Sequence, residues 1–264
     1  VTSINPSNVG HLRDKTCSQI ERRARLLGPA YRLFYYNPVE VVRGQGVHLY
    51  DSAGQEYLDA YNNVVSVGHC HPRVVQAISQ QPQTLCTHTR YLHDGILDYA
   101  EQLLPTFGGG IEHLMLTCTG SEANDLALRI AKHHTGHQGI IITSEAYHGN
   151  SDLTAGFSPS LGEFSPLGTW VGRVPTPDSY RVPVESTGRW LAAQDAEQNA
   201  DLQRRGQGVA AFIADSLFSS DGIFSPPTDL LPPVAEVVRA AGGLFIADEV
   251  QSGFGRSGDR FWGY

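Results

Sequence analysis

Residues 244–251 read Leu-Phe-Ile-Ala-Asp-Glu-Val-Gln, an apolar run that ends in two carboxylates and, after a valine, an amide. A short apolar run of this kind is typical of a buried strand. In sheets of parallel strands, ligands bind beyond the carboxyl ends of the strands. We therefore expect Asp248 to project from the end of a buried strand into a ligand-binding crevice.

The chain before this run alternates between apolar runs and amphipathic helical patterns. The predicted helices are 16–27, 73–80, 94–104, 121–134, 191–204 and 233–241. The predicted strands are 113–117, 140–143, 168–174, 209–214 and 244–247. From residue 66 onward, this alternation predicts an α/β fold with a mainly parallel sheet that helices cover on both faces.

The N-terminal part of the chain has a different pattern. Two alternating runs, 47–50 and 56–59, flank the sequence Asp51-Ser-Ala-Gly54. Such an arrangement predicts a β-hairpin whose turn is supplied by Asp51 and Gly54. The sequence therefore predicts an N-terminal segment with a hairpin, 1–65, followed by a larger α/β domain, 66–264.

Composition narrows the class of protein. The 264 residues carry a formal net charge of -8, which gives no basic surface for nucleic acid or for an anionic membrane. No apolar run approaches the ~20 residues of a membrane span. The four cysteines are widely separated and form no CxxC pair, the pattern of reduced thiols. We expect a cytoplasmic protein without nucleic-acid or membrane partners.

Two further motifs follow predicted strands. Thr119-Gly-Ser-Glu-Ala-Asn-Asp125 opens a helix, and Thr119 and Glu122 have the spacing of a capping box. Backbone N–H groups and the helix dipole favour an anion at such a start, so a phosphate is expected at Gly120 and Ser121. Tyr147-His-Gly149 follows the strand 140–143, where an aromatic side chain can stack on a flat ring.

The residue type at position 248 fits the chemistry of a pyridine ring. An ionised carboxylate beside the ring nitrogen keeps that nitrogen protonated, and the ring can then withdraw electrons from a neighbouring reaction centre. Asp248 is the candidate for this role.

Together these motifs resemble the class III aminotransferases, which are fold type I pyridoxal-phosphate enzymes. The specific parts are Gly-Ser-Glu-Ala-Asn-Asp at 120–125, Tyr-His-Gly at 147–149 and Phe-Ile-Ala-Asp-Glu-Val-Gln-Ser-Gly-Phe-Gly-Arg at 245–256. The resemblance implies pyridoxal 5'-phosphate as the cofactor, a truncated large domain with an N-terminal part of the small domain, and a homodimer. It also implies transfer of an amino group from a primary amine or amino acid to a 2-oxo acid.

The resemblance further implies a set of cofactor-binding residues: Gly120, Ser121, Tyr147, Asp215, Asp248 and Gln251. In relatives the first two positions hold the phosphate, the tyrosine stacks on the ring, Asp248 pairs with the ring nitrogen and Gln251 lies near the ring hydroxyl. Asp215 stands where relatives usually carry Glu, and this difference leaves its role toward cofactor or substrate open.

A narrower resemblance is to the ethanolamine-phosphate and hydroxylysine-phosphate phospho-lyases of the same family. It depends on the motifs at 61–64, 67–72, 90–94 and 175–181. Phospho-lyases expel a phosphate from the carbon next to the amine-bearing carbon. This reaction is an alternative to amino transfer, and a non-catalytic interaction module is a second alternative. Candidate substrate residues, for which a structural role is equally open, are Asn62, Asn63 and Arg90.

Pyridoxal-phosphate enzymes need a lysine that binds the cofactor as a Schiff base. The chain has only Lys15, in the N-terminal segment, and Lys132, about three helical turns or roughly 16 Å from Gly120. In relatives the lysine follows the Asp-Glu-Val-Gln motif. We therefore expect that the Schiff-base lysine is absent from this chain, that the chain is a fragment, and that these 264 residues alone show no turnover.

Two other hypotheses fit the sequence poorly. Gly253-Phe-Gly-Arg-Ser-Gly258 matches the dinucleotide pattern, but Asp248 intervenes after the strand, and the chain ends at 264, before the position about 20 residues on where an acidic residue is expected. The histidines at 69–71 and 133–137 lack a second cluster with zinc-like spacing. We expect neither a nicotinamide cofactor nor a metal.

Overall fold

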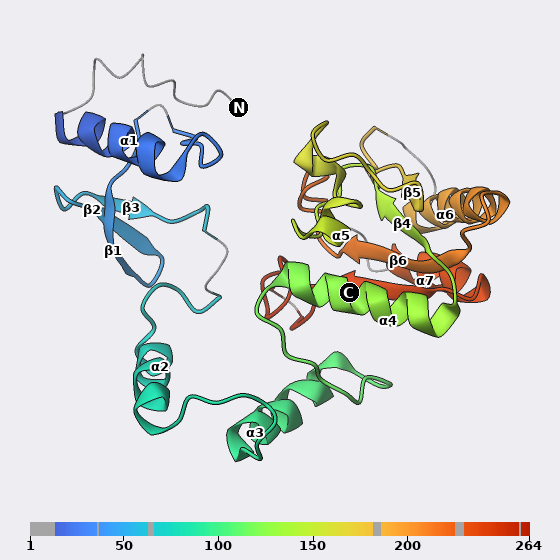
Figure 1. The fold of residues 1–264 in the computed structure, drawn as a ribbon, viewed down its shortest axis with the longest axis horizontal. Helices are drawn as coiled ribbons and strands as arrows, with labels where there is room; N and C mark the ends of the chain where they lie inside the picture. The colour runs from blue at the N-terminus through green and yellow to red at the C-terminus, as the bar shows by residue number, and fades with distance from the viewer. Residues whose placement is uncertain (1–13, 36, 63–65, 182–185, 225–229, 259) are drawn as a thin grey trace. The chain divides into compact units, whose positions relative to one another are not determined.

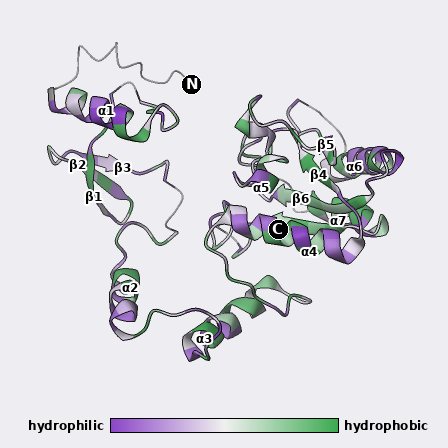
Figure 2. Ribbon diagram, in the orientation of Figure 1, coloured by the Kyte–Doolittle hydropathy of each residue, from purple (hydrophilic) through white to green (hydrophobic). Residues whose placement is uncertain are grey.

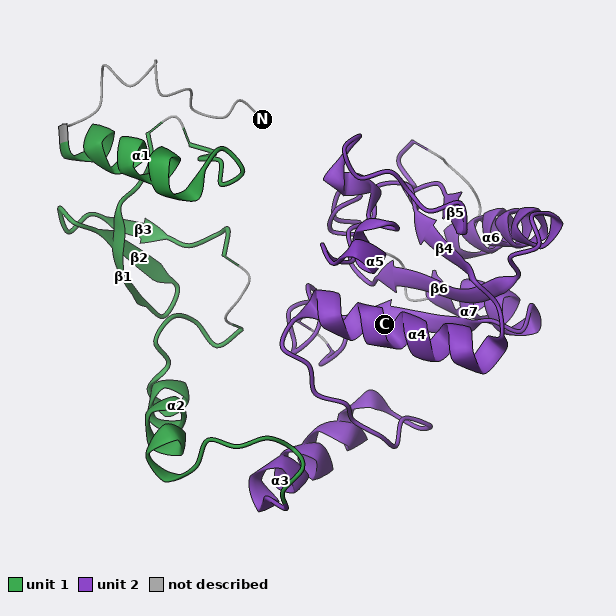
Figure 3. Cartoon of the chain, viewed as in Figure 1, with its two compact units in different colours: residues 1–91 green, residues 92–264 purple. Residues whose placement is uncertain are grey.

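The structure is a computed structural model that describes residues 14–35, 37–62, 66–181, 186–224, 230–258 and 260–264. The chain divides into two compact units, Val1–Tyr91 and Leu92–Tyr264 (Figure 3). The division falls after Tyr91, whereas the sequence placed the start of the larger domain at residue 66, and that domain boundary stays a prediction.

A small antiparallel sheet lies at the centre of the first unit (Figure 1). Its strands are β1, Val41–Gln45, β2, His48–Asp51, and β3, Glu56–Leu58, in the order β1-β2-β3. The β2–β3 pair confirms the predicted hairpin. In its turn, the Asp51 carboxylate accepts hydrogen bonds from the N–H groups of Ala53 and Gln55, both at 2.9 Å, and Gly54 adopts a positive φ of 82°.

Two helices complete the first unit. Helix α1, Asp14–Leu27, confirms the helix predicted at 16–27. Helix α2, Pro72–Thr84, begins with a proline. Backbone N–H groups in the first turn of a helix have no acceptor within the helix, so a proline there costs no hydrogen bond. None of the residues of α2 is buried among the described residues.

The second unit is built on a sheet of four parallel strands (Figure 1). They are β4, Gly139–Thr143, β5, Val171–Val174, β6, Val209–Asp215, and β7, Leu244–Asp248, in the order β5-β4-β6-β7. At its carboxyl end, β7 is in register with β6, so that Asp248 lies opposite Asp215. The parallel sheet predicted from the sequence is confirmed.

Helices cover both faces of this sheet. On one face, α6, Thr187–Arg204, and α7, Leu231–Ala240, pack on a core that includes Ile141 and Phe212. On the other face, α4, Gly120–Thr135, packs on a core that includes Ile140 and Ile142. Successive strand residues point to opposite faces, which is why neighbouring isoleucines join different cores. Figure 2 shows hydrophobic colour on strands of this sheet, β6 among them.

The remaining elements of the second unit are short or lie outside the sheet layers. Helix α3, Asp94–Leu103, continues into the 3-10 turn η2, Leu104–Phe107. Helix α5, Asp152–Ala155, and the 3-10 turn η3, Pro159–Leu161, follow β4. The five helices predicted from 73 onward are all present, with ends that differ by a few residues.

One predicted strand is wrong. Residues 113–117 form no strand, and Met115 and Leu116 are exposed by 64% and 53%. Within the described residues, no strand pairs with this segment. An apolar run favours a strand only when a neighbouring strand accepts its backbone hydrogen bonds, and the run itself does not encode that partner.

The predicted strand at 168–174 begins only at Val171. After β7, residues 250–257 form turns instead of the helix that a dinucleotide-binding loop requires. Among the described residues, no helix is both long and apolar enough to cross a membrane.

Candidate active site

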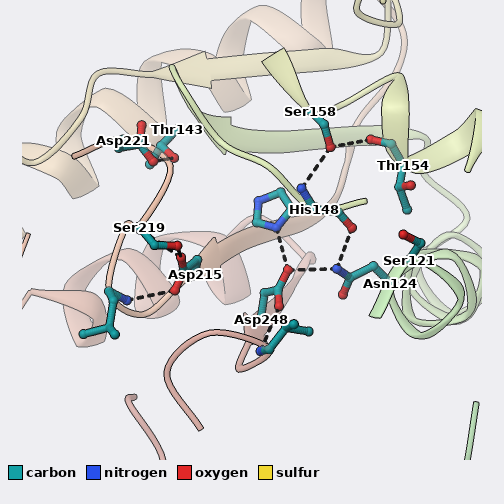
Figure 4. A network of polar contacts seen from close by, with 12 residues as sticks. Ser121, Asn124, Thr143, His148, Thr154, Ser158, Asp215, Ser219, Asp221 and Asp248 are labelled. Carbon is teal, nitrogen blue, oxygen red and sulfur yellow. Dashed lines mark hydrogen bonds and ion pairs between the residues drawn. The ribbon is translucent and has the colours of Figure 1, made fainter. Parts of the chain in front are cut away.

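A pocket of about 220 Å³ opens in the second unit beyond the carboxyl ends of β6 and β7. Loops and helix starts from four segments of the chain contribute to its wall (Figure 4). It is lined by Gly120, Ser121, Asn124, Tyr147, His148, Gly149, Asp215, Ser219, Ser220, Asp248, Val250 and Gln251. All six predicted cofactor-binding residues therefore line one pocket.

Asp248 ends β7 and is 6% exposed. Its Oδ2 atom accepts two hydrogen bonds of 2.8 Å, one from Asn124 Nδ2 and one that joins it to His148 Nδ1 (Figure 4). Its Oδ1 atom accepts a hydrogen bond from the Val250 N–H at 3.2 Å. Asp248 is thus a buried carboxylate with donors on both oxygens.

These donors decide the ionisation of Asp248. Burial raises the pKa of the carboxyl, but the hydrogen bonds from His148, Asn124 and the Val250 N–H outweigh it and hold the pKa below its ordinary value. Asp248 is therefore ionised at neutral pH, as its predicted role beside a pyridine nitrogen requires.

The start of α4 forms the second part of the pocket. Thr119 caps the helix, and its Oγ1 accepts the Glu122 N–H at 3.1 Å. The Glu122 carboxylate accepts the N–H of Cys118 at 2.8 Å, so the return bond of the predicted capping box reaches one residue further back than expected. Gly120 begins the helix, and a Cβ there would lie 2.8 Å from Val250 Cγ2. The backbone at Gly120 can therefore be approached closely only because it carries no side chain.

Ser121 lies beside the loop that follows β4. Its hydroxyl donates to Asn150 Oδ1 and accepts from the Asn150 N–H, both at 3.2 Å. Gly149 has a φ of 136°, and a Cβ there would lie 2.6 Å from Ser121 Oγ and from Thr154 Oγ1. The loop and the helix start are thus packed closely enough to fix Ser121 at the edge of the pocket.

Tyr147 and His148 belong to the same loop. Tyr147 is 42% exposed and lines the pocket, whereas the His148 side chain is 1% exposed behind it. The His148 N–H donates to Ser158 Oγ at 2.9 Å.

At the base of the loop, the Asp221 carboxylate accepts hydrogen bonds from Thr143 Oγ1 at 2.7 Å and from the Glu145 N–H at 2.9 Å. Asp221 follows β6, so it ties the ends of two strands together.

Asp215 lies in the pocket wall with its carboxylate already engaged. Its Oδ1 accepts the Leu217 N–H at 3.0 Å, and its Oδ2 accepts the Ser219 N–H at 2.9 Å as well as the Ser219 hydroxyl. This is the arrangement of a turn-forming aspartate. A role of Asp215 toward cofactor or substrate stays a prediction.

The predicted substrate residues belong to the first unit. Asn62 donates from its N–H and from Nδ2 to Asp59 Oδ1, at 2.8 and 3.1 Å, which is a turn-stabilising contact. The Arg90 N–H donates to His88 Nδ1 at 3.2 Å. Asn63 lies outside the described residues. Their substrate roles stay predictions.

Neither lysine lies in the pocket. Lys15 Nζ is 2.7 Å from a Glu40 carboxylate oxygen in the first unit. Lys132 Nζ lies 4.3 Å from the centre of the Trp170 ring, and burial lowers the pKa of this lysine. Neither Glu40 nor Trp170 lines the pocket, as expected from the positions of the lysines in the sequence.

Sequence reasoning gave no role to several residues of this region, among them Asn124, His148, Val250 and Asp221. The first three stand inside the motifs that predicted the site, and their position was a usable signal. Asp221 stands in no such motif, and its contacts with Thr143 and Glu145 span more than 70 residues of sequence.

The fold and the pocket define an α/β protein whose ligand site combines a helix start, an aromatic loop and an ionised carboxylate at the ends of parallel strands. A model of the family described as aminotransferase class-III matches residues 34–264. The chain belongs to this family, whose members are pyridoxal-phosphate-dependent enzymes.

Individual relatives include both aminotransferases and phospho-lyases by name. A Drosophila melanogaster protein named alanine–glyoxylate aminotransferase 2-like is 41% identical over 259 residues, covering 93% of this chain and 52% of its own. A Caenorhabditis elegans protein named ethanolamine-phosphate phospho-lyase homolog 1 is 37% identical, covering 93% of this chain and 56% of its own. The chain therefore spans about half the length of the curated relatives it matches.

Among solved structures, an Arthrobacter phospholyase in complex with phosphoethanolamine is similar to this chain. The two are 46% identical with a TM-score of 0.87, and the match covers 93% of this chain and 59% of the phospholyase.

The residues of the pocket fit the family's cofactor. Backbone N–H groups at a helix start suit a phosphate. Tyr147 offers an aromatic ring that can stack on the cofactor ring, and Val250 offers an apolar contact. The ionised Asp248 suits a protonated ring nitrogen. No Lys or Arg lines the pocket among the described residues, so the chain itself offers neutral donors to the phosphate.

Proposed function

We propose that the whole protein to which these residues belong is a pyridoxal-phosphate-dependent enzyme acting on a primary amine. The observation that carries the proposal is the buried, ionised Asp248 with Asn124 and His148 as donors, in a pocket shared with the start of α4. An unsupported carboxylate at this depth would take up a proton, and it could then no longer hold a positive charge beside it.

In this proposal each part of the pocket holds one part of the cofactor. Gly120 and Ser121 bind the phosphate, Tyr147 stacks on the ring, and Gln251 lies near the ring hydroxyl. Asp248 keeps a proton on the ring nitrogen. When bound, the cofactor supplies an electron-withdrawing ring next to the substrate amine. The chain contributes the orientation of the ring and the charge at its nitrogen.

For the reaction, we propose phosphate elimination from a phosphorylated amino alcohol such as ethanolamine phosphate. Support comes from the 46% identity to the Arthrobacter phospholyase and the 37% identity to the C. elegans phospho-lyase homolog. With water, ethanolamine phosphate would give acetaldehyde, ammonia and inorganic phosphate, and no 2-oxo acid takes part.

Amino transfer to a 2-oxo acid is the second candidate. The observation in its favour is the 41% identity to the Drosophila relative named as an aminotransferase. Both reactions would begin with loss of a proton from the amine-bearing carbon, so the pocket described here would serve either one. We further propose that the whole protein is a homodimer, as the family resemblance implies, and that it is cytoplasmic, as its widely separated cysteines indicate.

Assays of the full-length protein distinguish the two reactions. Ethanolamine phosphate without any oxo acid is expected to yield phosphate and acetaldehyde in equal amounts. Amino transfer from alanine to glyoxylate, without phosphate release from ethanolamine phosphate, would instead support the aminotransferase. The variant Asp248→Asn is the control, and we expect it to reduce either activity by about 10²-fold or more, because a neutral amide cannot stabilise the ring charge. Undiminished activity of that variant would contradict the proposed role of Asp248.

A further inference from the structure

Asn124 connects three segments that are far apart in the sequence. It lies in the second turn of α4 and is 7% exposed. Its Nδ2 atom donates to the His148 carbonyl oxygen and to Asp248 Oδ2, both at 2.8 Å (Figure 4). One amide group therefore joins α4, the loop after β4 and the end of β7.

The residue type at this position matters for the charge of Asp248. An asparagine amide offers two N–H donors, and here each has an acceptor. Because the amide is neutral, it can hold the carboxylate in place without cancelling its negative charge. A lysine or arginine at the same place would form an ion pair with Asp248 and compete with a positively charged ring nitrogen.

The position of Asn124 along α4 matters as well. Gly120, in the predicted phosphate site, precedes it by four residues, about one helical turn. The same helix thus presents its start to one end of the pocket and the Asn124 amide to Asp248. Through Asn124, the distance between the phosphate site and the carboxylate is set by a rigid element.

We propose that Asn124 is a positioning residue that orients the Asp248 carboxylate toward the ring nitrogen of the cofactor. This inference rests on the proposed function, since it needs a ring nitrogen in the pocket. His148 Nδ1 contacts the same carboxylate oxygen at 2.8 Å, so the two side chains fix that oxygen from two directions. Loss of Asn124 leaves a carboxylate that must be reoriented each time the ring binds.

The test compares two probes in the full-length protein. The first is pyridoxamine 5'-phosphate, which cannot form a Schiff base with a lysine. The second is its 1-deaza analogue, in which a C–H group replaces the ring nitrogen. For Asn124→Leu, which keeps the number and branching of the side-chain heavy atoms but has no donor, we expect the Kd of the first probe to rise about tenfold or more, the size expected for one charge-assisted hydrogen bond. The Kd of the deaza analogue is expected to change less than about twofold.

A matched control makes the same chemical change elsewhere. Asn199 lies on α6, outside the pocket, and accepts a hydrogen bond from Gln203. We expect Asn199→Leu to leave both Kd values unchanged. If Asn124→Leu does not fold, Asn124→Ser, which keeps a small donor, is expected to show the same selective loss at several-fold.

Two results would overturn the inference. Equal weakening of both probes would show that Asn124 only maintains the shape of the pocket, and an unchanged or tighter Kd for pyridoxamine 5'-phosphate would show that Asp248 needs no positioning by it. Failure of the unsubstituted protein to bind either probe would instead contradict the proposed function itself, and the inference with it.

Discussion

Two carboxylates of the second unit are buried to a similar degree but meet opposite surroundings. Asp195 on α6 is 0% exposed, and neither of its oxygens has a hydrogen-bond partner among the described residues. Asp248 at the end of β7 is 6% exposed and has three donors. Burial raises the pKa of Asp195 to about 7, whereas the donors hold the pKa of Asp248 below its ordinary value.

The comparison separates burial from function. Burial penalises the charged form of any carboxylate, and only partners that favour the charged form reverse that penalty. Asp248 has such partners at the pocket, and the described residues supply none to Asp195. Asp195 is therefore a source of pH-dependent instability, and Asp248 is a charge that the fold preserves.

The largest effect is expected from Asp195→Asn. The pKa of Asp195 is raised from 3.8 to about 7, so the folded state keeps a proton that the unfolded state loses in this range. The stability that this proton provides is complete below pH 3.8 and is lost as the pH rises toward 7. About three pKa units at about 1.4 kcal/mol each give a loss of up to about 4 kcal/mol. Asparagine cannot ionise, so urea unfolding of Asp195→Asn is expected to lack this slope.

The control for this prediction lies on the same helix. Glu197 is exposed, and Glu197→Gln is expected to leave the pH dependence of the free energy of unfolding as it is in the unsubstituted chain. Parallel pH profiles for the unsubstituted chain and Asp195→Asn would show that Asp195 has a partner in solution or ionises freely there.

A smaller effect on the free energy of unfolding is expected from His148→Phe. This effect weakens as the pH falls, whereas that of Asp195 grows as the pH rises from 3.8 toward 7. Phenylalanine keeps a ring near Phe157, whose centroid is 5.8 Å from that of His148, but removes the donor to Asp248. The pKa of Asp248 should rise, because burial is then less well opposed. At pH 7 we expect a loss of about 1.5–3 kcal/mol in the free energy of unfolding, the usual contribution of a hydrogen bond to a charged group.

The pH dependence provides the check on His148→Phe. A carboxylate with a lowered pKa stabilises the fold above its ordinary pKa, and this stability is lost as the pH falls through the lowered value. The difference between His148→Phe and the unsubstituted chain should therefore shrink in acid. His134→Phe, at an exposed position on α4, should cost less than about 0.5 kcal/mol at every pH. A difference that stays constant into acid would mean that His148 acts by packing alone.

The sequence predicted what is local in this comparison. Asp248 follows an apolar run directly, and Thr119 and Glu122 are three residues apart, so both features could be recognised from short stretches. The contact between Asn124 and Asp248 spans 124 residues, and no local pattern contains it. The apolar run 113–117 was misread for the same reason, because its pairing depends on distant residues.

Asp195 is an intermediate case. Leu191, Ala192 and Leu202 are buried on α6, and Asp195 lies four residues after the first and seven before the last. Helical periodicity thus places Asp195 on the buried face. That pattern is present in the sequence and predicts a buried carboxylate. It does not predict whether a residue packed against this face of the helix donates a hydrogen bond to the carboxylate.

The smallest effect is expected at a third carboxylate, Asp178. Its donors are an exposed guanidinium and two backbone N–H groups. Hydrogen bonding from Arg181 lowers the pKa of Asp178, and Arg181 Nη1 lies 2.5 Å from its Oδ2. The Arg181 side chain is 78% exposed, so water and salt screen the pair. The N–H groups of Tyr180 and Arg181 also bond to Asp178 Oδ1, at 3.0 and 3.2 Å, and these bonds do not need the guanidinium. Arg181→Ala is therefore expected to leave the urea midpoint nearly unchanged, in low salt and in 1 M salt alike. A clear loss of stability in low salt that disappears in high salt would instead place Asp178 with Asp248, as a carboxylate whose charge the fold depends on.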